Sequence, residues 1–336
     1  MDENRLVSSD LESGDADVSI RPPRLEDFVG QKTLKDNLRV FIEASKHRGE
    51  ALDHILFYGP PGLGKTTLSH IIAAEMGVNI KYISAPAISK TGDLAAIITN
   101  LEPNGVLFID EIHRLPIAVE EILYSAMEDY KIDFIVGEGP TARSLRIDLP
   151  KFTLIGATTR YGLLSAPLRD RFGITLQLQF YETEELQGII ERSADILKLK
   201  INEEGSRVIA QRSRGTPRIA NRLLRRIRDF LTVSKKNVID GELVKDALKK
   251  LGVDDNGLDE IDRKYLRAII DFYDGGPVGI DTIATVLSES KDTIEDTVEP
   301  FLMQRGFVSR TTRGRVITAR AWEYFNLKPK KTDLFI

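Results

Sequence analysis

Short apolar runs alternate with longer segments whose apolar residues recur every three or four positions, from about residue 53 to residue 180. Near-continuous apolar runs are typical of strands buried on both faces, and the longer spacing is typical of amphipathic helices. We expect strands at 54–59, 79–85, 105–111 and 152–159, and helices at 65–77, 93–101 and 118–129. The alternation predicts an α/β domain with a mostly parallel sheet between helices.

Beyond residue 181 the strand pattern stops and only helical spacing remains. The segments 183–200, 203–213, 216–234 and 240–251 all carry it. Each of three of them starts at or just after a residue suited to N-capping, namely Thr183, Thr216 and Asp240. We expect a small all-helical domain, followed by a polar, glycine-bearing linker at 252–260.

The last part of the chain predicts three helices and a hairpin. The helices are expected at 261–276, 279–288 and 291–306, with Pro300 marking a kink or irregular turn in the third. Two short β-prone stretches, 307–310 and 315–322, then surround an arginine-rich turn. This order predicts a winged-helix domain, a relative of the helix-turn-helix.

Composition narrows the class of protein. A chain of 336 residues is expected to form two or three domains. No apolar run approaches the roughly 18 residues of a membrane span, and residues 1–19 lack the layout of a signal peptide, so we expect a solvated acidic arm there. With no cysteine and four histidines, a disulfide or a thiolate metal site is excluded, and a reducing, cytoplasmic setting is favoured.

Charge is uneven along the chain although the formal net charge is only −4. Residues 1–20 hold six acidic residues and one arginine, whereas residues 301–336 hold eight Lys and Arg against two Asp and Glu. Solvated tails are the usual explanation of such runs, and a nucleic-acid contact is the alternative for the basic one. Arg310, Arg313 and Arg315 are the residues in question.

The segment GPPGLGKTT (59–67) has the spacing of a phosphate-binding loop, and it follows an expected strand and opens an expected helix. Gly59 and Gly64 let backbone N–H groups approach phosphate oxygens, and the helix N-terminus favours negative charge. Lys65 is predicted to reach the outer phosphates, and the Thr66 hydroxyl to bind Mg²⁺. The sequence therefore predicts an ATP site.

The segment VLFIDE (106–111) is an apolar strand that ends in two carboxylates. Unpaired charges are costly beside a buried strand, so packing does not explain them. We predict that Asp110 holds Mg²⁺, directly or through water, and that Glu111 polarises the attacking water as general base. Together with the loop, this pair favours ATP hydrolysis over nucleotide binding alone.

Three further groups are candidates for sensing or stabilising the transferred phosphate. Thr158 and Thr159 end the next expected strand, and either hydroxyl is suited to orienting water. Arg169 and Arg171 follow, and a guanidinium supplied by a neighbour stabilises the transferred phosphoryl group, although a surface salt bridge explains either arginine from spacing alone. Arg218 stands at the start of an expected helix in the small domain.

The chain resembles the AAA+ ATPases and, within them, the RuvB family of Holliday-junction branch-migration motors. The resemblance rests on seven segments in order, over about residues 20–328: RPPRLEDFVGQ, GPPGLGKTTL, LFIDEIHRL, LPKFTLIGATTR, PLRDRFG, GTPRIANRLLRR and RGFVSRTTRGRVIT. It implies an α/β P-loop AAA+ core with a small all-helical lid domain and a C-terminal winged-helix domain. The expected bounds are 20–181, 182–253 and 254–336, after an arm at 1–19.

The resemblance also implies roles for single residues. Sensor 1 would be Thr159 or Thr158, sensor 2 would be Arg218, and Arg171 is the better candidate for an arginine finger that acts on the next subunit. The remaining nucleotide contacts fall into three sets, which are Ile20, Arg21 and Tyr181 near adenine and ribose, Gly62, Lys65, Thr66 and Thr67 near the phosphates and Mg²⁺, and Glu128, Asp129 and Tyr130 near a neighbour's nucleotide.

A hairpin predicted at about 130–149 interrupts the ATPase domain. Its apolar residues alternate, and such a hairpin normally buries one face within its own domain. In the family a hairpin at this place binds the junction-recognising partner RuvA, so Ile132, Phe134 and Ile135 are the expected contacts.

The favoured function is therefore a DNA motor, which by resemblance is a hexameric ring around duplex DNA that works with RuvA and the resolvase RuvC. A shared finger-and-pocket site requires head-to-tail subunits that close into a ring. Two alternatives stay open: an ATP-switched loader or initiator that binds DNA through its winged helix, and a protein-remodelling ATPase. The expected reading helix of an initiator, 291–306, is acidic, which disfavours that alternative.

Overall fold

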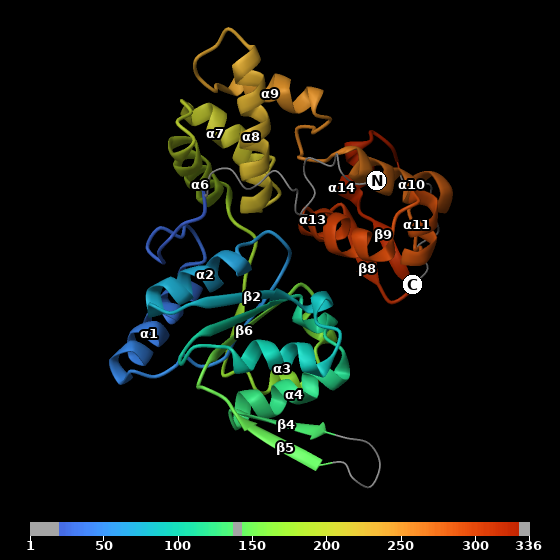
Figure 1. The fold of residues 1–336 in the computed structure, drawn as a ribbon. Coiled ribbons are helices and arrows are strands. Elements are labelled where there is room, and N and C mark those ends of the chain that lie inside the picture. Colours follow the sequence, from blue (N-terminus) through green and yellow to red (C-terminus); the bar gives the residue numbers. More distant parts are fainter. Residues whose placement is uncertain (1–19, 137–142, 329–336) are drawn as a thin grey trace. The chain divides into compact units, whose positions relative to one another are not determined.

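The computed structural model describes residues 20–136 and 143–328, and side chains are not described for residues 134–145. The chain forms two compact units, one of residues 21–179 and the other of residue 20 and residues 180–328. Each unit is described by itself (Figure 1). None of the helices in these ranges combines the length and the apolar character needed to span a bilayer.

The first unit is built on a five-stranded sheet in the order β2-β3-β6-β1-β7. All its strand pairs are parallel, and Ile55 lies between Ile155 and Ile174 in the register. The predicted parallel sheet is thus confirmed. The strands are β1 (Ile55–Tyr58), β2 (Ile80–Ser84), β3 (Val106–Asp110), β6 (Thr153–Thr158) and β7 (Ile174–Gln177).

Helices cover both faces of this sheet (Figure 1). Leu56, Leu107 and Leu154 face a buried cluster with the helices α3 and α4, while α1 and α2 cover the other face. The elements are α1 (Lys32–Arg48), α2 (Lys65–Met76), α3 (Thr91–Thr99), α4 (Ile117–Glu128) and α5 (Ala166–Arg169), with short 3-10 turns η1 (Ala85–Ala87), η2 (Ile112–Arg114) and η4 (Tyr161–Leu163).

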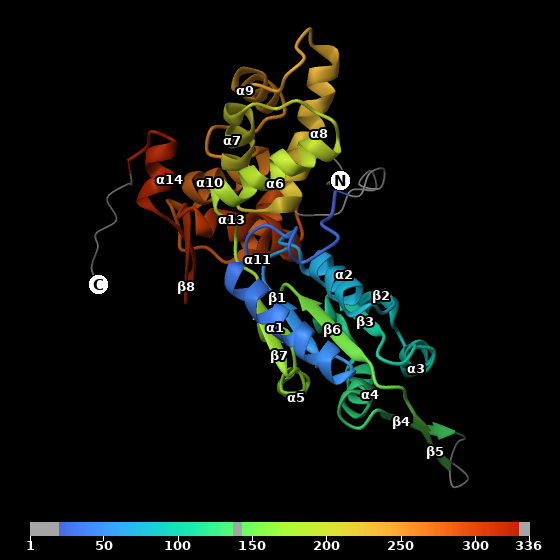
Figure 2. The ribbon, with the colours of Figure 1, turned by 90° about the vertical axis from the view of Figure 1, so that its left-hand side faces the viewer.

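An antiparallel hairpin, β4 (Lys131–Val136) and β5 (Arg143–Asp148), follows α4 and projects away from the sheet (Figure 1, Figure 2). Ile132 pairs with Ile147 and is fully buried. An ion pair between Arg146 and Asp133, with an Nε–Oδ1 distance of 2.8 Å, joins the two strands on the exposed side. The base of the hairpin is therefore part of the core of this unit.

The second unit begins with the predicted helical domain, confirmed as α6 (Thr183–Ile196), α7 (Glu203–Gln211), α8 (Pro217–Val233) and α9 (Gly241–Lys250). Asp240 caps α9 by accepting from the N–H of Leu243 at 2.8 Å. Thr183 is not a cap as predicted: Glu182 is the N-cap of α6, because its carboxylate and that of Glu185 form a reciprocal capping box. Thr216 is the N-cap residue of α8, as predicted, but its hydroxyl donates to the backbone oxygen of Arg214 and not to the helix.

A winged-helix domain completes the second unit. It comprises α10 (Glu260–Tyr273), α11 (Ile280–Leu287), α12 (Lys291–Thr293), the π-helical turn η5 (Ile294–Val298), α13 (Glu299–Gln304), β8 (Val308–Thr311), β9 (Gly314–Ile317) and α14 (Ala319–Tyr324). The irregularity predicted from Pro300 is η5, which ends two residues before it. The second strand is shorter than predicted, because Thr318 is the N-cap of α14, whose Ala321 and Trp322 pack into the domain core.

Candidate nucleotide site and DNA-binding wing

The predicted phosphate loop connects β1 to α2. Its glycines Gly59, Gly62 and Gly64 have φ values of 137°, 78° and 108°, which other residues rarely adopt. A Cβ on Gly59 would lie 2.5 Å from the backbone oxygen of Leu178, so no side chain fits there. The Lys65 ammonium is buried and donates to the backbone oxygens of Gly59 at 2.7 Å and Pro60 at 2.9 Å.

The strand order brings the other predicted groups to the same edge of the sheet. Because β3, β6 and β1 are parallel neighbours, Asp110, Thr158 and the phosphate loop all follow the carboxyl ends of adjacent strands. Asp110 accepts from the hydroxyl of Tyr82 at 3.0 Å and from the N–H of Glu111 at 3.0 Å. This is the edge at which parallel α/β sheets bind ligands.

Glu111 is held by three donors. Its Oε2 accepts from the N–H of Thr159 at 3.2 Å and the hydroxyl of Thr159 at 3.1 Å, and it lies 3.2 Å from Nδ1 of His113. Burial acts to raise the pKa of Glu111, but the bonds from His113 and Thr159 and the charge of Lys65 outweigh it and hold the pKa below its ordinary value. Glu111 is therefore a carboxylate, the form a general base requires.

The two candidate threonines differ in what they touch. Thr158 is fully buried, and its hydroxyl lies 2.8 Å from Nδ1 of His113. Thr159 bonds directly to the carboxylate of Glu111. This contact favours Thr159 as sensor 1. Sequence reasoning missed His113 and Tyr82. The only sequence signal for His113 is its place two residues after Glu111. No sequence signal indicates Tyr82, because the helix α3 lies between Tyr82 and Asp110 in the chain.

The oxygen ligands at the carboxyl edge of the sheet suit Mg²⁺. Among residues 20–136 and 143–328 there is no group of three or more His, Asp or Glu side chains that could hold a metal ion. Mg²⁺ in nucleotide sites takes one or two protein oxygens and completes its shell with water and phosphate. The hydroxyl of Thr66 at the start of α2 and the carboxylate of Asp110 are such hard oxygen ligands.

We expect Glu111→Gln to slow ATP hydrolysis about a hundredfold or more, since an amide does not accept a proton from water. Nucleotide binding should persist, because Lys65 and the loop are unchanged, so the variant should retain ATP. Steady-state turnover and retention of labelled ATP on a filter measure both effects. Glu121→Gln, which changes an exposed carboxylate on α4 of the same unit, is the control. Turnover of Glu111→Gln at the wild-type rate would contradict the role.

Arg171 lies apart from the phosphate loop, at another edge of the first unit. Its Nη2 is 3.0 Å from Oε2 of Glu128, and its guanidinium carbon lies 4.7 Å from the ring centre of Tyr124. Met127, Glu128, Asp170 and Arg171 line a pocket of about 340 Å³. The structure thus brings together Arg171, the predicted arginine finger, and Glu128, one of the three residues predicted to border a neighbour's nucleotide.

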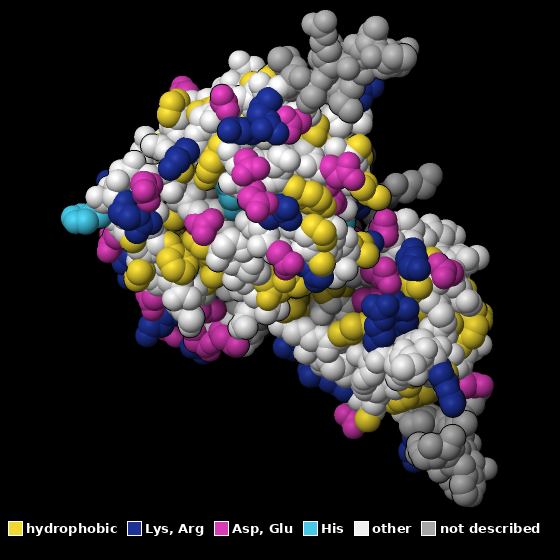
Figure 3. Space-filling model, turned by 90° about the horizontal axis from the view of Figure 1, so that it is seen from below, with side chains coloured by type: hydrophobic (Ala, Val, Ile, Leu, Met, Phe, Trp, Pro, Cys, Tyr) yellow, Lys and Arg dark blue, Asp and Glu magenta, His cyan; other side chains and the backbone are white. Residues whose placement is uncertain are grey.

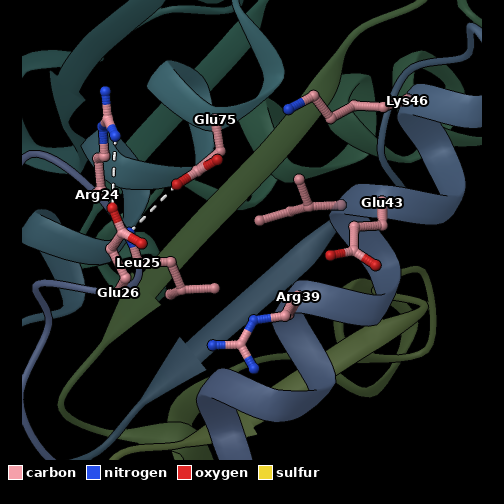
Figure 4. Close-up of a pocket in the computed structure, with 8 residues that line it drawn as sticks. Arg24, Leu25, Glu26, Arg39, Glu43, Lys46 and Glu75 are labelled. Carbon is pink, nitrogen blue, oxygen red and sulfur yellow. Dashed lines mark hydrogen bonds and ion pairs between the residues drawn. The ribbon is translucent and has the colours of Figure 1, made fainter.

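A second pocket, of about 360 Å³, lies between the segment 24–26, α1 and α2 (Figure 4). Its charges alternate in sign, and Figure 4 shows Glu75 bonded to the N–H of Leu25 across it. The lining residues are Arg24, Leu25, Glu26, Arg39, Ile42, Glu43, Lys46 and Glu75. It contains none of the predicted site residues, and its mixed charge selects neither anions nor cations.

Three predicted nucleotide contacts, Ile20, Tyr181 and Arg218, belong to the second unit. Arg192 donates to the backbone oxygen of Ile20 at 2.9 Å, and the N–H of buried Tyr181 donates to the oxygen of Gly215 at 2.9 Å. Arg218 lies in the first turn of α8, just after Gly215. The structure therefore joins Tyr181 to the loop that carries Arg218. Arg21, Thr67, Asp129 and Tyr130 are in the first unit, where Thr67 belongs to α2.

The wing is the hairpin β8–β9, and its three arginines do not behave alike. Arg310 is 62% exposed, and Arg313 is exposed at the turn. Arg315, in contrast, is buried: its Nε lies 2.8 Å from Oε1 of Glu299, and its Nη2 lies 3.0 Å from Oε1 of Glu295. Its guanidinium is thus paired with two carboxylates of its own domain, and the contact of Arg315 with DNA phosphates stays a prediction.

The Glu299 carboxylate organises this part of the domain. It accepts from the hydroxyl of Tyr265 at 2.8 Å as well as from Arg315. Burial works to lower the pKa of Arg315, but its hydrogen bond to Glu299 and the charge of that residue raise it above its ordinary value. Backbone bonds between Arg315 and Val278, at 2.8 and 3.0 Å, fasten the wing to the segment before α11. Arg315 thus anchors the wing.

The predicted RuvA contacts need one correction. Ile132 is fully buried against the core, so its side chain is not available to a partner. The side chains of Phe134 and Ile135 lie outside the described residues.

Charge is mixed on the face of the molecule that Figure 3 presents, where Lys and Arg side chains are interspersed with Asp and Glu. That face does not carry a broad field of one sign. Exposed ion pairs such as Arg207 with Glu203, at 2.9 Å, place opposite charges side by side.

The fold and the site define a P-loop ATPase of the AAA+ class, with a helical lid domain and a C-terminal winged helix. Three sequence models match consecutive parts of the chain: the Holliday junction DNA helicase RuvB P-loop domain at residues 20–178, the RuvB AAA lid domain at 181–254 and the RuvB C-terminal winged helix domain at 255–326. The chain belongs to the RuvB family.

Solved structures agree with this assignment. The Thermotoga maritima RuvB Holliday junction branch migration motor is 50% identical, with a TM-score of 0.85, over 92% of this chain and 99% of that one. A lysine-to-arginine mutant of that RuvB is 51% identical, with a TM-score of 0.86 and the same coverage. An arginine-to-alanine mutant matches at 50% identity, also with a TM-score of 0.86 and the same coverage.

Proposed function

We propose that this chain is an ATP-driven motor that moves Holliday junctions by branch migration. The observation that carries the proposal is the presence, on one chain of the RuvB family, of a phosphate loop aligned with Asp110 and Glu111 and of a wing with exposed Arg310 and Arg313. An ATPase alone needs no wing, and a DNA-binding domain alone needs no general base.

In the proposed reaction ATP is hydrolysed at the sheet edge. Lys65 leaves the backbone oxygens of its own loop for the phosphates, and Glu111 accepts the proton of the attacking water. When bound through Thr66 and Asp110, Mg²⁺ neutralises charge on the phosphates. The hydroxyl and N–H of Thr159 hold Oε2 of Glu111 and so orient the carboxylate that is to accept the proton.

We further propose that subunits assemble head-to-tail into a hexameric ring. Arg171 and Glu128 lie at a pocket separate from the phosphate loop, which suits an arginine that completes the site of the next subunit. A heterologous interface of this kind closes into a ring when the rotation permits. The N–H of Tyr181 donates to the oxygen of Gly215, in the loop that leads to Arg218. Both residues are proposed to contact the nucleotide from the lid, with Arg218 as sensor 2.

The wing is proposed to hold the DNA backbone. Arg310 and Arg313 are the exposed candidates, and Arg315 would reach a phosphate after leaving Glu295 and Glu299. Phosphate contacts fix position without selecting sequence. RuvA is the proposed partner of the β4–β5 hairpin, with Phe134 and Ile135 the remaining candidate contacts. RuvC is proposed to act on the same junction.

We expect Arg310→Ala to weaken duplex binding to a similar degree on every sequence and to reduce the salt dependence of binding by about one phosphate contact. Arg315→Ala should act differently: it leaves Glu299 buried without its partner and should lower the stability of the winged-helix domain by about 3 kcal/mol or more. Fluorescence anisotropy at several salt concentrations and thermal unfolding separate the two. A change in sequence preference for Arg310→Ala would contradict the backbone role.

The test of the whole proposal measures ATP turnover with and without duplex DNA, then movement of a synthetic four-way junction with RuvA added. Turnover stimulated by duplex and RuvA-dependent strand exchange are the expected results. Turnover indifferent to DNA, with no junction movement, would rule the motor out. An initiator would instead bind one sequence tightly and hydrolyse ATP slowly.

A further inference from the structure

The loop between α7 and α8 holds a buried arginine, Arg214, that reaches from the lid into the winged-helix domain. Its side chain is 2% exposed. Its Nε donates to the backbone oxygen of Gly257 at 3.1 Å, its Nη2 lies 3.3 Å from Oδ2 of Asp259, and it forms a close ion pair with Asp262. Its guanidinium carbon is 4.6 Å from the ring centre of Phe301 on α13.

These two carboxylates are also the capping box of α10. Asp259 accepts from the N–H of Asp262 at 3.0 Å, and Asp262 accepts from the N–H of Asp259 at 2.9 Å. Asp262 is fully buried, as is most of Asp259. Arg214 therefore holds the first turn of the first helix of the winged-helix domain, and Phe301 places it against the third helical segment as well.

The same loop leads directly to Arg218, the lid residue that is proposed to contact the nucleotide as sensor 2. Arg214 is succeeded by Gly215, Thr216, Pro217 and Arg218. Thr216 donates its hydroxyl to the oxygen of Arg214 at 3.1 Å, and a Cβ on Gly215 would lie 2.9 Å from Cβ of Phe180. This loop is tightly packed, so Arg218 and Arg214 are rigidly connected.

We propose that Arg214 is a positioning residue that fastens the winged-helix domain to the lid, so that both move as one lever. The purpose of this connection rests on the proposed motor function. The connection between the lid and the winged-helix domain does not depend on that function. A buried ion pair often adds no net stability over apolar residues of similar size, but it fixes one geometry. A fixed geometry is what the transfer of a lid rotation to the wing requires.

A second arginine supports the contact between the lid and the winged-helix domain. Arg212 is also buried, its Nε donates to the backbone oxygen of Asp254 at 3.2 Å, and it pairs with Asp255. A Cβ on Gly257 would lie 3.3 Å from Cα of Arg212, which leaves little space between the loop and the start of the winged-helix domain. Arg214 is nonetheless the one that reaches two different helices of that domain.

The lever is tested first by distance. Because the chain has no cysteine, Val233→Cys at the end of α8 and Thr282→Cys in α11 give one exposed pair for spin labels. In the full-length protein we expect one narrow distance that is the same with ADP and with a non-hydrolysable ATP analogue. Arg214→Met should broaden it. A nucleotide-dependent distance in the otherwise unchanged protein would overturn the lever.

Coupling is tested next, as branch migration per ATP hydrolysed. Arg214→Met and Asp262→Asn should lower this ratio about tenfold, within the usual range for coupling between sites, while Arg214→Lys recovers part of it. Arg207→Met, which removes an exposed pair on the same lid, should leave the ratio unchanged. A merely structural role predicts equal loss of both activities, and that result would overturn the proposal. If the wild-type protein moves no junction, the motor function fails, and the lever is judged on the distances alone.

Discussion

Arg171→Ala is expected to lower ATP turnover about a thousandfold or more, the effect of removing an arginine finger. The guanidinium would stabilise negative charge spread over the transferred phosphoryl group of a neighbouring subunit. Arg169→Ala is the matched control, because Arg169 lies two residues earlier, beside the Tyr161 ring at 5.3 Å. A comparable loss of ATP turnover for Arg169→Ala would contradict the assignment of the finger to Arg171.

The pair with Glu128 offers a second control. Glu128→Gln breaks the 3.0 Å ion pair but leaves the Arg171 guanidinium in place. If Arg171 acts only by holding the local fold, both variants should lose stability and activity together. If it acts as a finger, Glu128→Gln should keep most of the turnover. Thermal unfolding of each variant makes the comparison direct.

Lys65→Ala is expected to lower ATP turnover about a thousandfold and to weaken nucleotide binding, since one buried cation at the phosphates is lost. The fold should survive, because the two hydrogen bonds to Gly59 and Pro60 that the variant loses lie within the phosphate loop itself. Lys81→Ala, on the exposed side of β2, is the control. Wild-type turnover by Lys65→Ala would mean that the phosphate loop is not the active site.

The two variants together test assembly. Each Lys65→Ala subunit keeps Arg171, and each Arg171→Ala subunit keeps a working phosphate loop. In an equal mixture that closes into rings, about a quarter of the interfaces should join an intact loop to an intact finger. Turnover should therefore reappear on mixing two nearly inactive proteins. A mixture as inactive as its parts would contradict a finger that acts on the next subunit.

Much of the ATPase site was predictable because it depends on backbone and on adjacency in a parallel sheet. The spacing of Gly59, Gly64 and Lys65 requires one loop conformation, and the ends of β1, β3 and β6 must meet at one edge. The contacts of Glu111 with His113 and Thr159 were not predictable, since they depend on side-chain rotation. Local sequence does not determine which hydroxyl turns toward the carboxylate.

The burial of two predicted contact residues has a common cause. Arg315 and Ile132 were assigned to surfaces from local patterns, a basic turn and an alternating strand. Burial depends instead on what the rest of the fold places against a residue. Glu299 is sixteen positions from Arg315 along the chain. No local signal pairs them, so the basic turn alone did not reveal this internal ion pair.

The π-helical turn η5 and α13 carry acidic residues that the wing uses internally. Glu295 and Glu299 face Arg315, so the helix that reads bases in related domains is engaged in holding the hairpin. The remaining contact surface at the wing is suited to phosphates, which recur at the same spacing whatever the bases. The binding free energy then changes little from one base-pair position to the next. A step of one base pair therefore does not require the wing to leave a more tightly bound sequence.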